Sequence, residues 1–144
     1  MLSKTSQYAL RATLYLAHQP VDRRVRASDV AEELGVPANY LGKILHTLAR
    51  HGLLRSERGP GGGFRLARAP HDVTLAEAIE PFEKLARSRM CPLGRSVCRD
   101  SSPCAVHKRW KVASAGMLEF FRETTVAELQ EPAPAKSINE PRGR

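Results

Sequence analysis

Apolar residues in the first fifty positions recur at helical spacing in three segments that are separated by turn signals. Residues 3–18 combine good helix formers with a broad apolar face, so they predict a first helix. Residues 19–26 are rich in charge and contain Pro20, which predicts a turn. Ser28 is then expected to cap a second, shorter helix, which Gly35 should end.

A third helix is expected from residue 38 to about residue 51. Its apolar face carries Leu41, Ile44, Leu45 and Leu48, and its polar residues lie largely on other faces. Two short helices joined by a glycine-containing turn form the helix-turn-helix pattern, here about residues 28–51, whose second helix enters the DNA major groove. A purely structural helix pair would show the same pattern.

The next segment, residues 53–68, favours the DNA-binding alternative. Strands at 53–57 and 64–67 flank a glycine-rich tip at 59–63, which predicts a β-hairpin. A hairpin directly after a candidate recognition helix is a winged helix. The tip could also suggest a nucleotide-phosphate loop, but it lacks the Gly-Lys-Ser/Thr ending, and a strand follows it instead of a helix. The fold class expected is therefore mainly α with a small β-hairpin, with a winged helix-turn-helix domain over residues 1–70.

The second half of the chain predicts two further helices and a tail. Thr74 and Glu77 form a capping box that opens a connecting helix within residues 71–90. The longest helix is expected over residues 108–130, with an apolar and aromatic stripe formed by Trp110, Ala113, Met117, Phe120 and Phe121. A small domain has too little core to bury this stripe, so we predict a dimerisation helix; packing against its own domain is the alternative. Residues 131–144 are polar and proline-rich, which predicts a disordered tail.

Length and charge limit the class of protein. A chain of 144 residues holds one domain, or one domain with an appendage. The net charge is +8, and residues 1–70 carry 11 Lys and Arg against 5 Asp and Glu, so most of the excess lies in the predicted winged helix. No signal-peptide core or membrane span is apparent, which predicts a cytoplasmic protein. No catalytic constellation suggests an enzyme.

Candidate ligands for a metal gather in residues 91–107, which contain every cysteine of the chain. Six residues separate Cys91 from Cys98, five separate Cys98 from Cys104, and two separate Cys104 from His107. The intervening residues are too polar for burial to offset the roughly 1–2 kcal/mol per residue that ordering costs. Thiolates and an imidazole could order the segment by binding zinc or an iron-sulfur cluster. An intramolecular disulfide framework would leave one of three thiols over.

Basic residues at the start of the predicted long helix bear on the same question. Lys108, Arg109 and Lys111 fall where the helix dipole disfavours cations. A nearby anionic group would offset this, and a thiolate-ligated cluster is one such group. A solvated basic patch explains the pattern equally well.

The order of these features carries a family resemblance. The motifs are Tyr-Ala-Leu-Arg-Ala at 8–12, Arg-Gly-Pro-Gly-Gly-Gly-Phe at 58–64, three cysteines, a Cys-x-x-His and a long terminal helix. From residue 1 to about 130 the chain resembles the IscR/NsrR family of bacterial transcription regulators. The resemblance implies a homodimer on a partly palindromic double-stranded DNA operator, with one iron-sulfur cluster, [2Fe-2S] or [4Fe-4S], in each subunit.

The resemblance also implies which residues act. Carried onto this chain, the cluster ligands are Cys91, Cys98 and Cys104, with His107 as fourth ligand. Other members take the fourth ligand from the partner's first helix, which here has no Asp or Glu but ends at His18. The gap between Cys91 and Cys98 is one residue longer than in IscR.

We expect DNA contacts from the second and third helices and from the wing. The expected residues are Ser28, Asn39, Tyr40, Lys43, Arg58, Gly61, Gly62, Gly63 and Arg65. The predicted function is a regulator, acting as a repressor, whose operator affinity responds to nitric oxide, redox state or iron status. One alternative is a winged-helix regulator with structural zinc or no metal. Another is a small iron-sulfur electron carrier, which would have no use for a basic winged helix.

Overall fold

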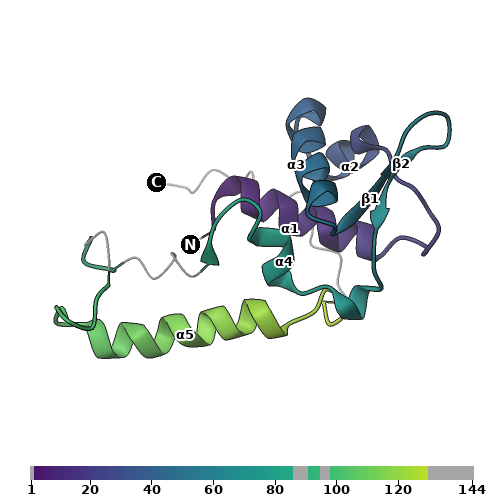
Figure 1. Ribbon diagram of the computed structural model, residues 1–144. Coiled ribbons are helices and arrows are strands. Elements are labelled where there is room, and N and C mark those ends of the chain that lie inside the picture. Colours follow the sequence, from purple (N-terminus) through teal and green to yellow (C-terminus); the bar gives the residue numbers. More distant parts are fainter. Residues whose placement is uncertain (1, 86–90, 95–97, 130–144) are drawn as a thin grey trace.

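The computed structural model describes residues 2–85, 91–94 and 98–129, and shows a mostly helical protein with one antiparallel hairpin (Figure 1). The predicted tail at 131–144 lies outside the described residues. The elements, in chain order, are α1 (Lys4–Ala17), α2 (Ala27–Leu34), α3 (Ala38–Arg50), β1 (Leu54–Glu57), β2 (Gly63–Leu66), the 3₁₀ turn η1 (Pro70–Asp72), α4 (Leu75–Ile79) and α5 (His107–Glu123).

The helix-turn-helix is formed by α2 and α3, as predicted. Gly35 ends α2 in the left-handed conformation, at φ 65°, which suits a glycine C-cap. The prediction that Ser28 caps α2 is wrong. The N-cap is Arg26, which has an extended backbone and whose carbonyl accepts hydrogen bonds from the N–H groups of Asp29 and Val30.

The wing is the β1–β2 hairpin, in which Leu54 faces Leu66 and Glu57 faces Gly63. The first strand begins one residue later than predicted, and the second lies one residue earlier than predicted. The hairpin is extended by an isolated antiparallel bridge between Val25 and Phe64. The segment before α2 therefore lies beside the wing as a third extended piece of chain.

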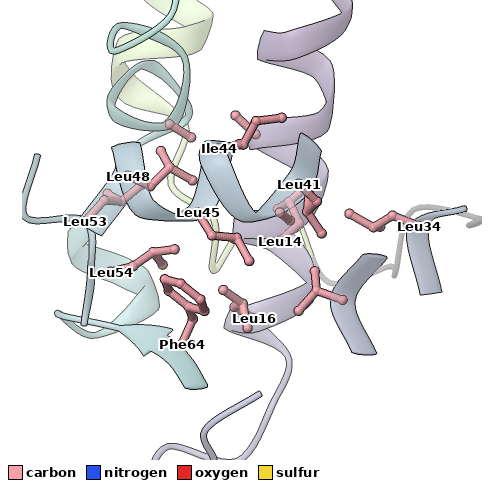
Figure 2. Packing of buried hydrophobic residues seen from close by; sticks show 14 of the residues in the cluster. Leu14, Leu16, Leu34, Leu41, Ile44, Leu45, Leu48, Leu53, Leu54 and Phe64 are labelled. Carbon is pink, nitrogen blue, oxygen red and sulfur yellow. The ribbon is translucent and has the colours of Figure 1, made fainter. Parts of the chain in front are cut away.

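The main core lies where α1, α2, α3 and the hairpin meet (Figure 2). The apolar face of α3 that the sequence predicts is buried: Leu41, Ile44, Leu45 and Leu48 are each at most 2% exposed. Leu14 and Leu16 of α1 and Phe64 of β2 pack against them. Burying side chains of this size stabilises the fold by about 1.5–3 kcal/mol each, which fixes α3 relative to the wing.

The connecting helix is much shorter than predicted. Thr74 and Glu77 form both hydrogen bonds of the capping box, as expected. However, α4 ends at Ile79, two residues before Pro81, which cannot continue a helical hydrogen-bond ladder. Residues 86–90 lie outside the described chain.

The last helix is also shorter than predicted, and it packs against α4 (Figure 1). It ends at Glu123 and not near residue 130, because Thr124 turns to an extended conformation. The Thr124 carbonyl accepts from Leu75 N, and Val126 N donates to Val73 O. Pairing with residues 73–75 thus replaces the last predicted turns of the helix. Among the described residues, no helix has the length and apolar character needed to cross a membrane.

Candidate nucleic-acid interface and cysteine loop

The exposed face of α3 carries the three residues predicted to enter the major groove. Asn39, Tyr40 and Lys43 are all exposed. Tyr40 is nevertheless anchored to α1, because its hydroxyl is hydrogen-bonded to Thr5 Oγ1 and its ring lies edge-on to Tyr8, with centroids 6.0 Å apart. The polar face of α3 is therefore held at a fixed orientation by α1 as well as by the core beneath it.

A groove runs between α3 and β1, and sequence reasoning missed part of its polar lining. Lys43, His46, Thr47 and Arg50 line it from the helix, and Ser56 lines it from the wing. Arg50 Nη2 donates to Thr47 Oγ1 at 3.1 Å, and Thr47 Oγ1 donates to Lys43 O at 2.9 Å. His46 and Arg50 were not among the predicted DNA contacts. Their positions three and seven residues after Lys43 place them on the same face, and this spacing could have identified them.

The wing fully exposes some of its predicted residues and half-buries others. Arg58 and Gly61 are exposed at the tip. Gly62 and Gly63 have a structural reason to be glycine: a Cβ at Gly62 would lie 2.3 Å from Glu57 O, and one at Gly63 would lie 2.6 Å from Val25 O. Their identity is therefore required by the hairpin itself, whether or not phosphates approach them.

Two further predicted DNA contacts have different surroundings. Ser28 is exposed on α2. Arg65 has a side chain only 26% exposed, and its guanidinium lies 3.9 Å from carboxylate oxygens of both Asp22 and Glu57. Its Nε is buried without a hydrogen-bond partner among the described residues. Arg65 is thus partly neutralised by acidic neighbours.

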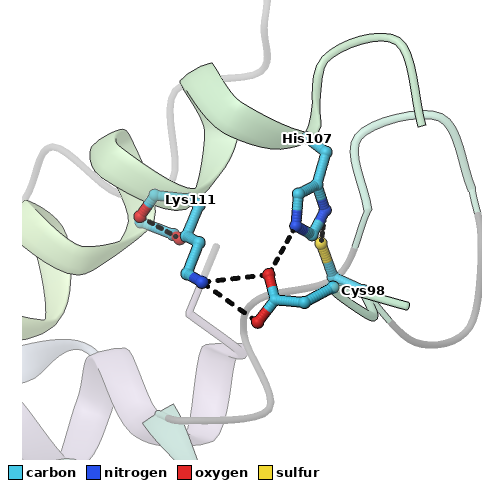
Figure 3. A network of polar contacts seen from close by, with 5 residues as sticks. Cys98, His107 and Lys111 are labelled. Carbon is cyan, nitrogen blue, oxygen red and sulfur yellow. Dashed lines mark hydrogen bonds and ion pairs between the residues drawn. The ribbon is translucent and has the colours of Figure 1, made fainter. Parts of the chain in front are cut away.

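The structure brings the four predicted cluster ligands together as two pairs. Cys91 Sγ lies 3.6 Å from Cys104 Sγ, and Cys98 Sγ lies 3.0 Å from His107 Nδ1 (Figure 3). Cys91 and His107 are buried, at 5% and 8% exposure, whereas Cys98 and Cys104 are partly exposed. All three cysteines are thiols.

An acidic residue that sequence reasoning did not single out lies at the second pair. Asp100 Oδ1 is 2.8 Å from His107 Nε2, and Lys111 Nζ donates to both Asp100 oxygens at 2.9 and 3.0 Å. The hydrogen bond from His107, followed by that from Lys111, holds the pKa of Asp100 below its usual 3.8. The sequence left open an anionic cluster or a solvated basic patch at the start of the long helix, and the structure places the Asp100 carboxylate beside Lys111.

The donor set fits an iron-sulfur cluster or zinc in its chemistry. Two sulfurs bound to one tetrahedral ion at about 2.3 Å lie about 3.8 Å apart, close to the 3.6 Å between Cys91 and Cys104. Across the described residues, however, no three His, Cys, Asp or Glu side chains gather into one metal site. The two pairs are therefore separate in this structure.

The predicted dimerisation stripe is divided between two faces of α5. Phe120 is 51% exposed and Ala113 is exposed, whereas Trp110, Met117 and Phe121 are half-buried. Phe121 packs against the core, Leu118 is buried against Ile79 of α4, and Ser114 is also buried. Val112, which the stripe did not include, is 75% exposed. The face of α5 that carries Leu118 thus packs against its own domain, which was the alternative to dimerisation. The face that carries Val112 and Phe120 remains exposed.

Comparison with known proteins identifies the family. The model of the Rrf2 family, described as an iron-dependent transcriptional regulator, matches residues 2–132. The chain belongs to the Rrf2 family. Its winged helix and long last helix are thus those of an Rrf2 regulator.

Several transcriptional regulators and solved structures resemble the chain over nearly all its length. A protein of Aquifex aeolicus assigned to the HTH-type transcriptional regulators is 35% identical over 131 residues, 90% of each chain. IscR of Vibrio campbellii is 27% identical over 139 residues, 96% of this chain and 82% of that one. Among solved structures, T. potens IscR has a TM-score of 0.70 and 26% identity, over 90% of this chain and 85% of that one. CymR of B. subtilis, the global cysteine regulator, has a TM-score of 0.75 and 22% identity, over 90% and 95%.

These comparisons confirm the resemblance to IscR and the winged-helix fold. The chain is a DNA-binding transcriptional regulator of the Rrf2 family, related to IscR. The relatives and neighbours reported above are regulators and not enzymes.

Proposed function

We propose that the protein is a homodimeric repressor that binds a partly palindromic operator and whose affinity is set by one iron-sulfur cluster in each subunit. One observation carries the proposal: a single small Rrf2 chain combines a basic winged helix with a set of metal-ligand side chains. These side chains are three thiols and an imidazole, which lie as two close donor pairs. Each part of the proposal has its own structural support.

Support for DNA binding comes from the α3–β1 surface. Lys43 and Arg50 place positive charge along the groove, and Arg58 places it at the exposed tip of the wing. Lysine and arginine bind phosphates and can read guanine edges, while asparagine such as Asn39 can pair with adenine. The excess of 11 basic over 5 acidic residues in positions 1–70 favours the approach of DNA to this half of the molecule.

Support for a homodimer comes from the uncovered face of α5. Val112 and Phe120 expose apolar side chains on a helix whose opposite face is buried against α4 through Leu118. A second copy of the same helix would cover them. Two winged helices must lie about 34 Å apart to enter successive major grooves on one face of the duplex, and a pair of α5 helices would fix that separation.

Support for a cluster comes from the ligand chemistry of the loop. Cys91, Cys98, Cys104 and His107 would hold it, as soft thiolates with one imidazole. The Rrf2 family is described as an iron-dependent regulator, which favours an iron-sulfur cluster, [2Fe-2S] or [4Fe-4S], over zinc at these donors. Such a cluster supplies a redox-active group that oxygen or nitric oxide destroys and that iron scarcity depletes.

A continuous chain of packed elements connects the loop to the DNA-binding surface. His107 is the first residue of α5, which packs on α4, and α4 packs on α1, which packs on α3. Ordering the cysteine loop would bias the position of α5 and hence the spacing of the two winged helices. A coupling of a few kcal/mol would change operator affinity by one to two orders of magnitude.

The test is to purify the full-length protein anaerobically and to measure its visible spectrum, iron, acid-labile sulfide and zinc. The proposal predicts a brown protein with equal amounts of iron and sulfide, and loss of colour when Cys98 is replaced by Ala. Colourless protein with stoichiometric zinc, still colourless after attempted cluster reconstitution, would leave a winged-helix regulator with a structural metal. A brown protein that binds no DNA duplex would support the electron-carrier alternative.

A further inference from the structure

The carboxylate of Asp100 connects two side chains of the same helix. Its Oδ1 lies 2.8 Å from His107 Nε2, and both of its oxygens accept from Lys111 Nζ at 2.9 and 3.0 Å (Figure 3). His107 and Lys111 are four residues apart on α5, so they project from one helix face. Asp100 is thereby held from two sides at the start of α5.

The contact with Asp100 determines which nitrogen of His107 carries the proton. An ionised carboxylate can only accept hydrogen bonds, so Nε2 must be the donor. In a neutral ring the other nitrogen, Nδ1, then carries the accepting lone pair, and this atom lies 3.0 Å from the Cys98 Sγ, whose thiol can donate to it. The ring thus turns its metal-binding lone pair toward the cysteine and its N–H toward the carboxylate.

His107 is buried and Asp100 is exposed, as expected if Asp100 orients the His107 ring from the surface. The His107 side chain is 9% exposed, whereas that of Asp100 is 73% exposed. The ring has little room to rotate, and an exposed carboxylate contributes little to the core. Among the described residues, the hydrogen bonds and ion pairs of Asp100 go to His107 and Lys111.

We propose that Asp100 is a positioning residue for the cluster: it fixes His107 in the Nε2–H tautomer, so that His107 ligates through Nδ1, and Lys111 holds Asp100 in place. Metal-ligating histidines commonly donate their second ring N–H to a carboxylate, which fixes the ring and raises its basicity. The inference rests on the proposed function for its cluster part. The tautomer and its cause are properties of the metal-free chain.

The first experiment is therefore made on metal-free protein. Nitrogen NMR of the ¹⁵N-histidine-labelled full-length chain, at mildly alkaline pH, reports the tautomer of each of the five histidines. We expect the Nε2–H form for His107 in the wild type and a mixture of tautomers in Asp100→Ala. Asp100→Asn, which keeps an acceptor oxygen, should retain most of the wild-type ratio. The other histidines are internal controls, and a far-UV circular dichroism spectrum checks that each variant folds.

The second experiment uses cluster-loaded protein. Histidine labelled with ¹⁵N at only one ring position is incorporated, and nitrogen hyperfine coupling is measured in the reduced, paramagnetic form. The strong coupling of a directly bound nitrogen should arise from the Nδ1 label, and the Nε2 label should show only the weak coupling of a remote ring nitrogen. Asp100→Ala should lose its cluster to a chelator about 10- to 100-fold faster than the wild type, the size of effect found when an outer-shell partner of a metal ligand is removed. Lys111→Gln should show a smaller increase, and Lys108→Gln, the same change on the same helix, should show none.

The outcomes separate this inference from the proposed function. A loaded protein whose coupling comes from Nε2, or a His107 tautomer that Asp100→Ala leaves unchanged, would overturn the inference while the cluster proposal stands. A protein that never holds a cluster would overturn the proposed function and with it the ligand role of His107. In that case the NMR result would still decide whether Asp100 orients the ring.

Discussion

The backbones of Val25 and Phe64 form a closed antiparallel pair: Val25 N donates to Phe64 O at 2.9 Å, and Phe64 N donates to Val25 O at 2.8 Å. Val25 precedes α2, and Phe64 lies in the returning strand of the wing. The pair therefore joins the hairpin to the helix-turn-helix. Both residues are also buried, at 3% and 5% exposure, so water does not compete for their hydrogen bonds. The two DNA-binding parts should therefore move as one body.

Replacing Gly63 with Ala tests this connection. The backbone φ of Gly63 is 147°, and a Cβ there would lie 2.6 Å from Val25 O. We expect the free energy of unfolding to fall by about 1–3 kcal/mol, measured by chemical denaturation. Gly61→Ala is the matched control, because its φ is 74° but the space around it is open. Its cost should be about 1 kcal/mol, and equal losses for the two variants would contradict the close packing against Val25.

Replacing Arg58 with Ala tests the wing as a DNA contact. Binding to an operator selected from random duplexes should weaken at least several-fold. The slope of log affinity against log salt should also fall by about 1, because one phosphate contact is lost. Arg122→Ala, on the exposed surface near the end of α5, is the control for loss of one positive charge. Unchanged affinity of Arg58→Ala at physiological salt would show that the wing tip does not touch DNA.

Replacing Val112 with Glu tests the uncovered face of α5 as the dimer interface. The charge should weaken self-association strongly, because a buried unpaired carboxylate is costly, while the fold of each subunit should persist. Sedimentation over a concentration series measures this. Val21→Glu introduces the same change at an apolar residue that is 84% exposed and distant in sequence, and it should leave the dimer intact. If both variants self-associate as strongly as the wild type does, this face of α5 is not the dimer interface.

Replacing Leu118 with Ala probes the opposite face of the same helix. Leu118 is 4% exposed and packs with Ile79 and Leu85. Its truncation should lower the free energy of unfolding by about 2–5 kcal/mol. A loss below about 1 kcal/mol in denaturant titration would mean that α5 does not pack on α4 as the structure has it.

The stability contributed by Glu77 should depend on pH with a definite sign. Burial raises the pKa of Glu77, but hydrogen bonds from the Thr74 backbone and from Arg68, with the charge of Arg68, outweigh it and leave the pKa below its ordinary 4.5. Because the folded pKa is depressed, the ionised carboxylate stabilises the fold above about pH 4.5, and this contribution is lost as pH falls through the folded value.

Glu77→Gln should therefore lower the free energy of unfolding at neutral pH by at most about 1 kcal/mol, because it removes the charge that pairs with Arg68 while Gln can keep the capping box. The difference from the wild type should shrink as the pH is lowered below about 4.5 in a pH series of denaturant titrations. Glu80→Gln, at an exposed residue just beyond α4, should change stability by less than about 0.5 kcal/mol. If the difference in free energy of unfolding between Glu77→Gln and the wild type stayed constant as the pH was lowered, the charge of Glu77 would contribute nothing to stability.

Local pattern predicted those features that depend on neighbours in the chain. The apolar spacing of Leu41, Ile44, Leu45 and Leu48 gave α3, Gly35 gave the end of α2, and Thr74 with Glu77 gave the start of α4. In each case the physical cause lies within one or two helical turns. Propensity and capping chemistry act over this range, so sequence alone was sufficient.

Tertiary contacts explain what sequence reasoning missed. Ser28 is not the cap of α2 because Val25 pairs with Phe64, which lies 39 residues away in the sequence. The next residue, Arg26, is still extended and is the N-cap, so α2 begins at Ala27. Residue 124 leaves the helical path because it pairs beside Leu75. Asp100 gave no signal, since its contact with His107 depends on how an irregular loop folds back onto α5.

Operator affinity measured with and without the cluster decides whether the cysteine loop controls DNA binding. The same anaerobic preparation is divided, one half is stripped of iron by a chelator, and both halves are titrated with one selected operator duplex at fixed salt. The two affinities should differ by about 10-fold or more, and a Cys98→Ala protein should always behave like the stripped half. Equal affinities for loaded and stripped protein would contradict control of DNA binding by the cysteine loop.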